Sequence, residues 1–105
     1  GVTGGIRPTP RNVAVMADQV HGGAEGPNNW QVIGISRDQW KLLAAAITLG
    51  GNVRAGVEGN LYLPDGTMCK SNGELIGKAR QVVEEAGRRV AMIGEARQML
   101  GLKEA

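Results

Sequence analysis

Apolar residues recur at helical spacing in three stretches of the chain, and a capping signal precedes each stretch. The first helix is expected to begin with Thr9 as N-cap and to end at His21-Gly22-Gly23. Residues 36–39 and 71–74 each fit a capping box, which predicts the starts of two further helices. The expected inward positions are Val13, Met16, Ala17 and Val20 in the first helix, Trp40, Leu43, Ala44 and Ile47 in the second, and Leu75, Ala79, Val82 and Ala86 in the third.

Strand patterns lie between these helices. Residues 30–35 are apolar on both faces, as in a buried parallel strand, and residues 52–58 alternate between apolar and polar positions. Residues 1–6 are interpreted as the tail of a strand and its turn. A strand, a helix and a strand within about 30 residues indicate a right-handed βαβ crossover. The sequence therefore predicts an α/β fold with three parallel strands and outer helices.

The strand that begins at residue 52 is the only one with charges built into its pattern. Val53, Ala55 and Val57 are expected on one face, with Arg54 and Glu58 on the other. These two charges lie roughly 13 Å apart along a strand, too far for a direct ion pair. Glu58 falls where the strand ends, and ligands bind at the carboxyl ends of strands in parallel α/β folds. The alternative interpretation is a solvated edge strand with two exposed charges.

The remaining segments predict a loop and a short last helix. Residues 60–70 contain the turn signal Leu63-Pro64-Asp65-Gly66 and are too long for a minimal connection. Residues 95–100, closed by Gly101, indicate a terminal helix that packs on the outside of the domain. On the third helix the pairs Glu74–Lys78 and Arg80–Glu84 are spaced for exposed ion pairs.

Composition adds limits to this picture. The 105 residues are 42% hydrophobic, which fits one globular domain, and the 12 basic and 10 acidic residues are interleaved, which does not favour nucleic acid as a partner. Cys69 is the single cysteine, so an intrachain disulfide is excluded and a reducing compartment is expected. Neither a signal-peptide pattern nor a transmembrane-length apolar run is seen. We therefore expect a cytoplasmic protein that does not bind membranes.

The run VRAGVEGNLYLPDG, followed by KSNGEL, resembles the last barrel strand and following loop of the β-keto acid cleavage enzymes, the group that includes the 3-keto-5-aminohexanoate cleavage protein. The likeness covers the whole chain, through GVTGGI, TPRN, WQVIGI, LAAAITLGGNVRAGVE and the terminal EARQMLGL. It implies the last three βα units of a (β/α)8 barrel, with residues 1–105 forming a single partial domain whose upstream units are absent. It also implies a divalent metal, usually zinc, and cleavage of a β-keto acid with coenzyme A as co-substrate.

The resemblance implies roles for Glu58 and Arg54, whereas Gly59 stands where the family has a functional aspartate. Glu58 matches the family's metal-ligating glutamate, whose two histidine partners lie in an H-x-H motif that this sequence lacks. Arg54 matches the arginine that steers the substrate carboxylate or a developing oxyanion, although an interior arginine paired with another carboxylate is the structural alternative. Gly59 departs from the family, which has a proton-handling aspartate after the glutamate. His21, the only histidine, is expected to favour a helix end rather than to bind metal.

Four residues before predicted helix starts are candidates for contact with the phosphates of coenzyme A. They are Ser36, Arg37, Lys70 and Ser71. The alternative is that both serines are ordinary N-caps. Cys69 has no histidine nearby in sequence that would make it a nucleophile.

The resemblance implies one function and leaves a second open. The first is part of a zinc-dependent enzyme that cleaves a β-keto acid with acetyl-CoA and releases acetoacetate. The second is a non-catalytic fragment that acts as an oligomerising or ligand-binding α/β module, which Gly59 and the missing histidines favour. Three parallel strands with helices on one side leave a sheet face uncovered. We therefore expect the rest of the barrel, or other copies in a homo-oligomer, to cover it.

Overall fold

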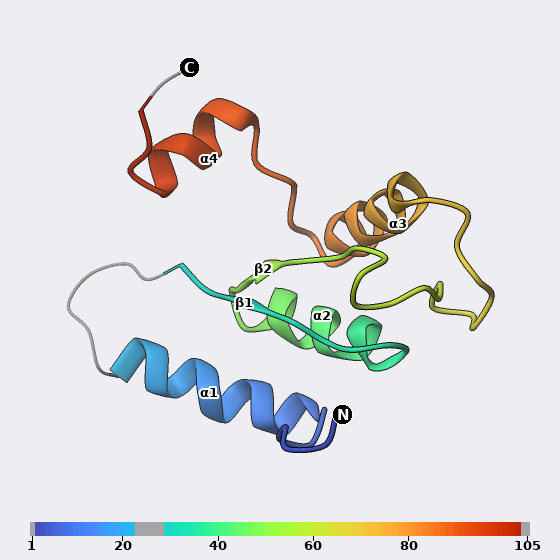
Figure 1. The fold of residues 1–105 in the computed structure, drawn as a ribbon. Helices are drawn as coiled ribbons and strands as arrows, with labels where there is room; N and C mark the ends of the chain where they lie inside the picture. The colour runs from blue at the N-terminus through green and yellow to red at the C-terminus, as the bar shows by residue number, and fades with distance from the viewer. Residues whose placement is uncertain (1, 23–28, 104–105) are drawn as a thin grey trace.

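The computed structural model describes residues 2–22 and 29–103, which contain four helices and two short strands (Figure 1). In chain order these are α1 Pro10–Gly22, β1 Gln31–Val32, α2 Asp38–Thr48, β2 Asn52–Val53, α3 Asn72–Glu85 and α4 Ile93–Met99. β1 and β2 pair in parallel, with Gln31 opposite Asn52 and Val32 opposite Val53. Because α2 connects them, the predicted βαβ unit and the α/β class are confirmed, and the complete barrel remains a prediction.

The strands are shorter than the sequence predicted. Only two residues of the expected segment 30–35 and two of the segment 52–58 have strand geometry. The expectation of a strand tail in the first residues is wrong for residues 2–6, which turn back so that the Gly5 N–H donates to the Val2 carbonyl at 2.9 Å. A strand needs a neighbour for its backbone groups. In the described parts β1 has such a neighbour on one side only, so the apolar pattern alone did not produce a longer sheet.

Two of the three predicted helix caps are confirmed. The Thr9 hydroxyl accepts from the Asn12 N–H at 3.2 Å, and the Ser71 hydroxyl accepts from the Glu74 N–H at 3.1 Å. The capping box at Ser36 is wrong, because Ser36 has a φ of 58° and Arg37 is the residue that precedes α2. A left-handed residue turns the chain sharply here, and the Gln39 N–H bonds the Ser36 carbonyl rather than its hydroxyl.

The core lies between α2, α3 and β2. Its buried members are Leu43 and Ile47 on α2 and Ala79 and Val83 on α3, with Leu43 only 2% exposed. Half-buried apolar residues pack against this cluster: Trp40, Val53, Ala55 and Val82. The predicted inward positions on α2 and α3 are therefore largely confirmed, and Val53 and Ala55 lie on the face of their strand that the alternation assigned to the core.

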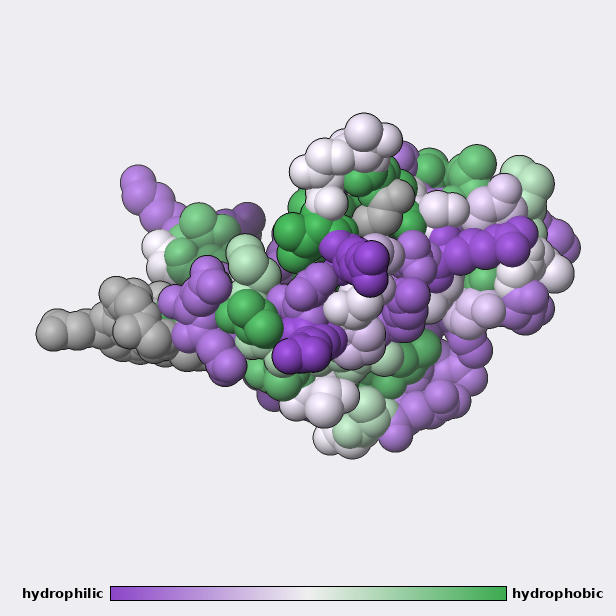
Figure 2. All heavy atoms as spheres, turned by 90° about the horizontal axis from the view of Figure 1, so that it is seen from below, coloured by the Kyte–Doolittle hydropathy of each residue, from purple (hydrophilic) through white to green (hydrophobic). Residues whose placement is uncertain are grey.

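Some predicted core positions are wrong, because α2 has neighbours on two sides and because Ala86 is the C-cap residue at the exposed end of α3. Leu42 and Ala46 are buried, whereas Ala44 and Ala86 are exposed. Leu42 faces α1, whose Met16 and Val20 line a groove toward β1 and remain exposed. The view from below shows apolar side chains reaching the surface in several places among polar ones (Figure 2). A single helical stripe in the sequence does not show that a helix will pack against two partners.

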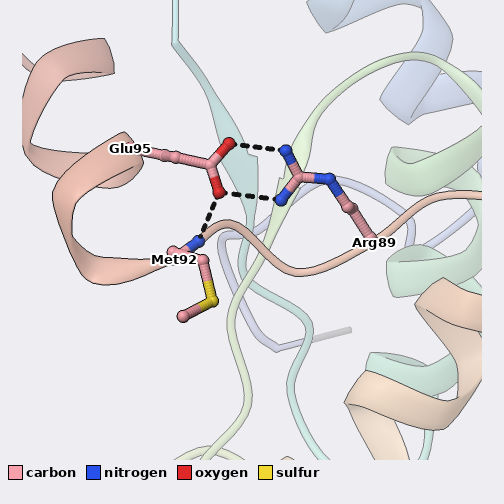
Figure 3. A network of polar contacts seen from close by, with 3 residues as sticks. All are labelled: Arg89, Met92 and Glu95. Atoms are coloured by element: carbon pink, nitrogen blue, oxygen red, sulfur yellow. Dashed lines mark hydrogen bonds and ion pairs between the residues drawn. The ribbon is translucent and has the colours of Figure 1, made fainter.

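The C-terminal helix stands apart from the other elements (Figure 1). α4 has no buried residue, and Ile93 is 78% exposed, so the helix does not pack on the core of this chain, and its packing against the outside of a complete barrel stays a prediction. Its position is held by Glu95, which accepts from both terminal nitrogens of Arg89 and from the Met92 N–H (Figure 3). Gly101 follows with a φ of 67°, as predicted for the residue that closes the helix.

The exposed face of α3 carries one of the two predicted ion pairs. Arg80 and Glu84 are joined at 2.9 Å, whereas Lys78 donates to Gln81 instead of pairing with Glu74. Among the helices of residues 2–22 and 29–103, none has the length and apolar character needed to cross a membrane.

Candidate functional site

Arg54 and Glu58 line one small hollow of about 140 Å³. The hollow is formed by the residues that follow β1 and β2, so it lies at the carboxyl ends of the two parallel strands. The other lining residues are Ile33, Gly34, Ile35, Gln39, Gly56 and Gly59. The structure thus brings together the two residues to which the sequence assigned the chemistry, in the part of the sheet where ligands bind in parallel α/β folds.

The alternation of the segment persists beyond the end of β2. Val53 and Ala55 pack toward the helices, and Arg54 and Glu58 are exposed on the opposite side. Glu58 itself lies in a turn, because the N–H groups of Gly59 and Asn60 both donate to the Gly56 carbonyl, at 3.3 and 3.2 Å. The Val57 N–H bonds the Asn72 side chain at 2.8 Å and so ties this turn to the start of α3.

The Glu58 carboxylate lies over Gly56. A Cβ atom at Gly56 would overlap the carboxylate oxygens, so the glycine leaves the space in which the side chain rests. Within residues 2–22 and 29–103, no side chain or backbone group hydrogen-bonds or ion-pairs with the side chain of either Arg54 or Glu58. Within the described residues Arg54 thus has no carboxylate partner and both charged side chains are exposed, and the pairing of Arg54 with a carboxylate from another strand stays an open alternative.

The chemistry of this donor set fits a divalent cation only in part. A carboxylate oxygen is a suitable ligand for zinc, and the exposed Glu58 supplies one. In the described ranges, no three His, Cys, Asp or Glu side chains gather as a metal site would require. The side chain of His21 lies outside the described residues. Glu58 therefore fits as one ligand of an ion whose other ligands come from elsewhere.

The four candidate phosphate contacts lie in two places. The Ser36 N–H donates to the Gly59 carbonyl at 2.7 Å, which joins the two strand ends beside Glu58. Arg37 is exposed and its guanidinium lies 4.9 Å from the centre of the Tyr62 ring. Lys70 and Ser71 are exposed at the start of α3, where the Ser71 hydroxyl already caps the helix. The N-cap alternative thus holds for Ser71 and fails for Ser36.

A buried amide pair beside the hollow escaped the sequence analysis. Asn60 and Gln39 are 2% and 4% exposed, and the Asn60 Nδ2 donates to the Gln39 Oε1 at 3.2 Å. The sequence pattern placed Gln39 in a capping box and Asn60 at the start of the predicted loop 60–70. The available signal was helical spacing, because Gln39 precedes Leu42 and Leu43 by three and four positions and so shares their buried face.

The predicted loop 60–70 folds as a small hairpin. The Cys69 N–H donates to the Leu61 carbonyl at 2.8 Å, and the Leu63 N–H donates to the Thr67 carbonyl at 2.8 Å. At its tip, hydrogen bonds from the Thr67 N–H and hydroxyl hold the pKa of the Asp65 carboxyl below its usual value. This hairpin is anchored to α2, since the Trp40 Nε1 donates to the Tyr62 carbonyl at 2.7 Å.

The sequence of this chain is similar to the sequences of a known enzyme family. Residues 1–102 match the family described as beta-keto acid cleavage enzyme. The 3-keto-5-aminohexanoate cleavage enzyme of Fusobacterium nucleatum subsp. nucleatum is 40% identical over 93 residues, which are 89% of this chain and 33% of that protein. The enzyme of the same name from Acetoanaerobium sticklandii is 40% identical over 102 residues, which are 97% of this chain and 36% of the relative.

A more distant relative carries acetyl-CoA in its name. The 3,5-dioxohexanoate:acetyl-CoA acetone transferase of Paraburkholderia graminis is 34% identical over 108 residues, covering 100% of this chain and 34% of that protein. The chain thus spans about a third of the length of the curated relatives that it matches. The match over residues 1–102 and the identity to these enzymes confirm the resemblance found in the sequence. The chain belongs to the beta-keto acid cleavage enzyme family.

Proposed function

We propose that this chain forms the C-terminal three βα units of a (β/α)8 enzyme that cleaves a β-keto acid with acetyl-CoA as co-substrate and releases acetoacetate. The observation that carries the proposal is the hollow at the strand ends, where Arg54 and Glu58 are exposed together and unpaired within the described residues. Family membership supports the reaction class, and the names of relatives support acetyl-CoA as the second substrate.

The proposed reaction exchanges two acyl groups. The bond between C2 and C3 of the β-keto acid breaks, and a bond forms between that C2 and the carbonyl carbon of the acetyl group. Acetoacetate thus contains the carboxylate and C2 of the substrate together with the acetyl group, and the remaining acyl group leaves as its coenzyme A thioester. No oxidant or reductant is needed, because the two carbonyl carbons only exchange partners.

Arg54 and Glu58 have separate roles in this proposal. The Arg54 guanidinium binds the substrate carboxylate through two parallel hydrogen bonds and holds the acid in the hollow. Glu58 supplies one carboxylate ligand to a zinc ion, and histidines from upstream units complete the site. When bound, such an ion polarises the substrate's carbonyl oxygens as a Lewis acid.

The coenzyme A thioester is proposed to bind across the same end of the sheet. Arg37 is exposed beside Tyr62, and Lys70 lies at the N-terminal end of α3, where the helix dipole favours an anion. Ser36 and Ser71 complete the set through the hydroxyl groups of their exposed side chains. We place the assembled enzyme in the cytoplasm as a homo-oligomer, in which upstream units or other copies cover the open side of the sheet.

A chimeric enzyme tests this function. Here "chimeric enzyme" means the A. sticklandii relative in which the matched 36% of its length is replaced by this chain, to which the matched residues are 40% identical. We expect it to bind about one zinc ion per chain and to form acetoacetate from a β-keto acid and acetyl-CoA. Glu58→Gln should weaken zinc binding at least tenfold, whereas Glu85→Gln, an exposed carboxylate on α3, should leave it unchanged.

A second variant separates substrate binding from metal binding. Arg54→Lys keeps the positive charge but loses the paired donors, so the KM for the β-keto acid should rise about tenfold while zinc content stays the same. Equal zinc binding by the parent and Glu58→Gln would contradict the role of Glu58. A folded, zinc-loaded chimeric enzyme that forms no acetoacetate, even with an aspartate restored at Gly59, would favour the non-catalytic α/β module.

A further inference from the structure

Gln39 is a buried polar residue that lines the hollow together with Arg54 and Glu58. It lies in the first turn of α2 and approaches β1 closely, because a Cβ atom at Gly34 would lie 2.6 Å from the Gln39 Cα. A buried amide normally has partners for both its oxygen and its nitrogen. The partners of the Gln39 Oε1 and Nε2 atoms therefore show whether the protein alone completes the hydrogen bonds of this amide.

A chain of hydrogen bonds fixes the orientation of the Gln39 amide. The Tyr62 N–H can only donate, so the atom of Asn60 that faces it at 3.0 Å is Oδ1. The other end of Asn60 is therefore Nδ2, which donates to the Tyr62 carbonyl at 2.8 Å and to Gln39 at 3.2 Å. A donor requires an acceptor, so the Gln39 atom facing Asn60 is Oε1.

The nitrogen of Gln39 is consequently the end left without a protein partner. No acceptor for Nε2 is found among residues 2–22 and 29–103. The amide cannot turn over without losing its bond to Asn60, which is itself held at both ends by the Tyr62 backbone. Gln39 Nε2 is not fully buried, so it reaches water in the hollow, and an oxygen of a bound ligand can take the place of that water.

We propose that Gln39 is a specificity-determining residue for the acid substrate, whose carboxylate oxygen accepts a hydrogen bond from Nε2 beside Arg54. This inference rests on the proposed function, because it takes the hollow as the place where the β-keto acid binds. The hollow of about 140 Å³ is smaller than the pockets that hold drug-sized ligands, and it suits the carboxylate end of a small acid rather than a coenzyme.

The neutral amide adds something that Arg54 cannot supply alone. The Arg54 side chain is flexible and attracts any anion. The Gln39 Nε2 donor is held in place by Asn60 and forms a good hydrogen bond only with an oxygen at one position. A site built to hydrogen-bond a substrate oxygen discriminates strongly against ligands that lack it. Gln39 thus favours acids whose carboxylate reaches the Arg54 side of the hollow.

The test measures binding of acetoacetate to the zinc-loaded chimeric enzyme, which does not depend on turnover. Gln39→Glu keeps an oxygen acceptor for Asn60 and replaces only the donor with an anionic oxygen. We expect the Kd for acetoacetate to rise at least tenfold, and the KM for acetyl-CoA to change less than twofold. Gln98→Glu adds the same charge at an exposed position of α4 and should leave both values unchanged.

Two further measurements protect this test from a folding artefact. Gln39→Met removes the donor without adding charge and should raise the same Kd at least threefold. In the parent protein, the Gln39 side-chain amide resonance should shift, and its hydrogens should exchange more slowly, when acetoacetate binds. That NMR measurement applies even if both Gln39 variants unfold, and an unmoved resonance at saturation would overturn the inference.

The outcomes separate the inference from the proposed function. If acetoacetate binding depends on Arg54 and Glu58 but not on Gln39, only the role of Gln39 is wrong. If the folded parent chimeric enzyme does not bind acetoacetate, both proposals are overturned.

Discussion

Val53 and Ala55 pack against the helices, whereas Arg54 and Glu58, on the other side of the same segment, are exposed in a hollow. One side contacts the cluster around Leu43, which is almost fully buried. The other side makes no side-chain hydrogen bonds or ion pairs with the described parts of the chain. Changes on the helix side should therefore alter the free energy of unfolding, and changes on the hollow side should alter ligand binding.

The largest effect is expected on the helix side. Leu43→Ala removes a buried side chain from the centre of the core and should lower the free energy of unfolding by about 2–5 kcal/mol. Ile93→Ala, at a position 78% exposed on α4, should change it by less than about 0.5 kcal/mol. Urea unfolding of the chimeric enzyme checks both values. Equal changes in the free energy of unfolding for the two variants would show that the cluster around Leu43 is not the main source of stability.

The next largest effect on the free energy of unfolding is expected at the hollow, where Gly34 and Gly59 should differ in their tolerance of a side chain. A Cβ atom at Gly34 would lie 2.6 Å from the Gln39 Cα, so Gly34→Ala forces backbone movement and should cost about 1–3 kcal/mol. At Gly59 the nearest atom to such a Cβ is the Gly34 carbonyl oxygen at 3.7 Å, an ordinary contact. Gly59→Ala should thus be tolerated. Similar unfolding midpoints for both variants would show that α2 does not approach β1 this closely.

A smaller effect is expected for the pH dependence of α4, a helix that has no buried residue. Hydrogen bonds from Arg89, and then from the Met92 N–H, lower the pKa of Glu95 from its ordinary 4.5 to about 2. Because the folded pKa is depressed, this contact stabilises the position of α4 fully above about pH 4.5, and the stabilisation is lost as pH falls toward 2. Since the pair is solvent-exposed, the effect on stability should be small.

The protection of the α4 amides, which is their exchange rate relative to the intrinsic rate at the same pH, measures this loss between pH 5 and 2. Arg89→Gln should lower the protection of α4 at pH 5 and remove most of the dependence of this protection on pH. Arg80→Gln, which removes an ion pair within α3, should leave exchange in α4 unchanged. If the protection of the α4 amides in Arg89→Gln still depends on pH as it does in the parent, a group other than Glu95 is responsible.

The smallest effect on stability is expected from Gly59→Asp, which restores the residue that the family resemblance places after the glutamate. The clearance around Gly59 predicts a change in unfolding free energy within about 0.5 kcal/mol. Acetoacetate formation by the chimeric enzyme should nevertheless rise at least tenfold, because a carboxylate becomes available for proton transfer. Gly59→Asn has a similar size without the proton-handling group and should not produce this gain. Equal rates for both variants would rule out the carboxylate's role.

Much of the local structure was predictable, because it depends on residues close together in sequence. The Thr9 and Ser71 caps, the left-handed Gly101 after α4 and the Arg80–Glu84 pair all follow from spacings of a few residues. The Ser36 cap failed for a tertiary reason. The start of α2 is pressed against Gly34, and Ser36 takes a left-handed turn with its N–H bonded to the Gly59 carbonyl.

The sequence by itself determined the βαβ unit, the family and the alternation that separates Arg54 and Glu58 from the core residues beside them. These follow from periodicity and motif order, which a single chain displays without reference to its neighbours in space. Only the tertiary structure decided that α2 is buried on two sides, that α4 stands apart, and that Gln39 meets Asn60 beside the hollow. The physical reason is that burial and amide orientation depend on partners distant in sequence, such as the 21 positions that separate Gln39 from Asn60.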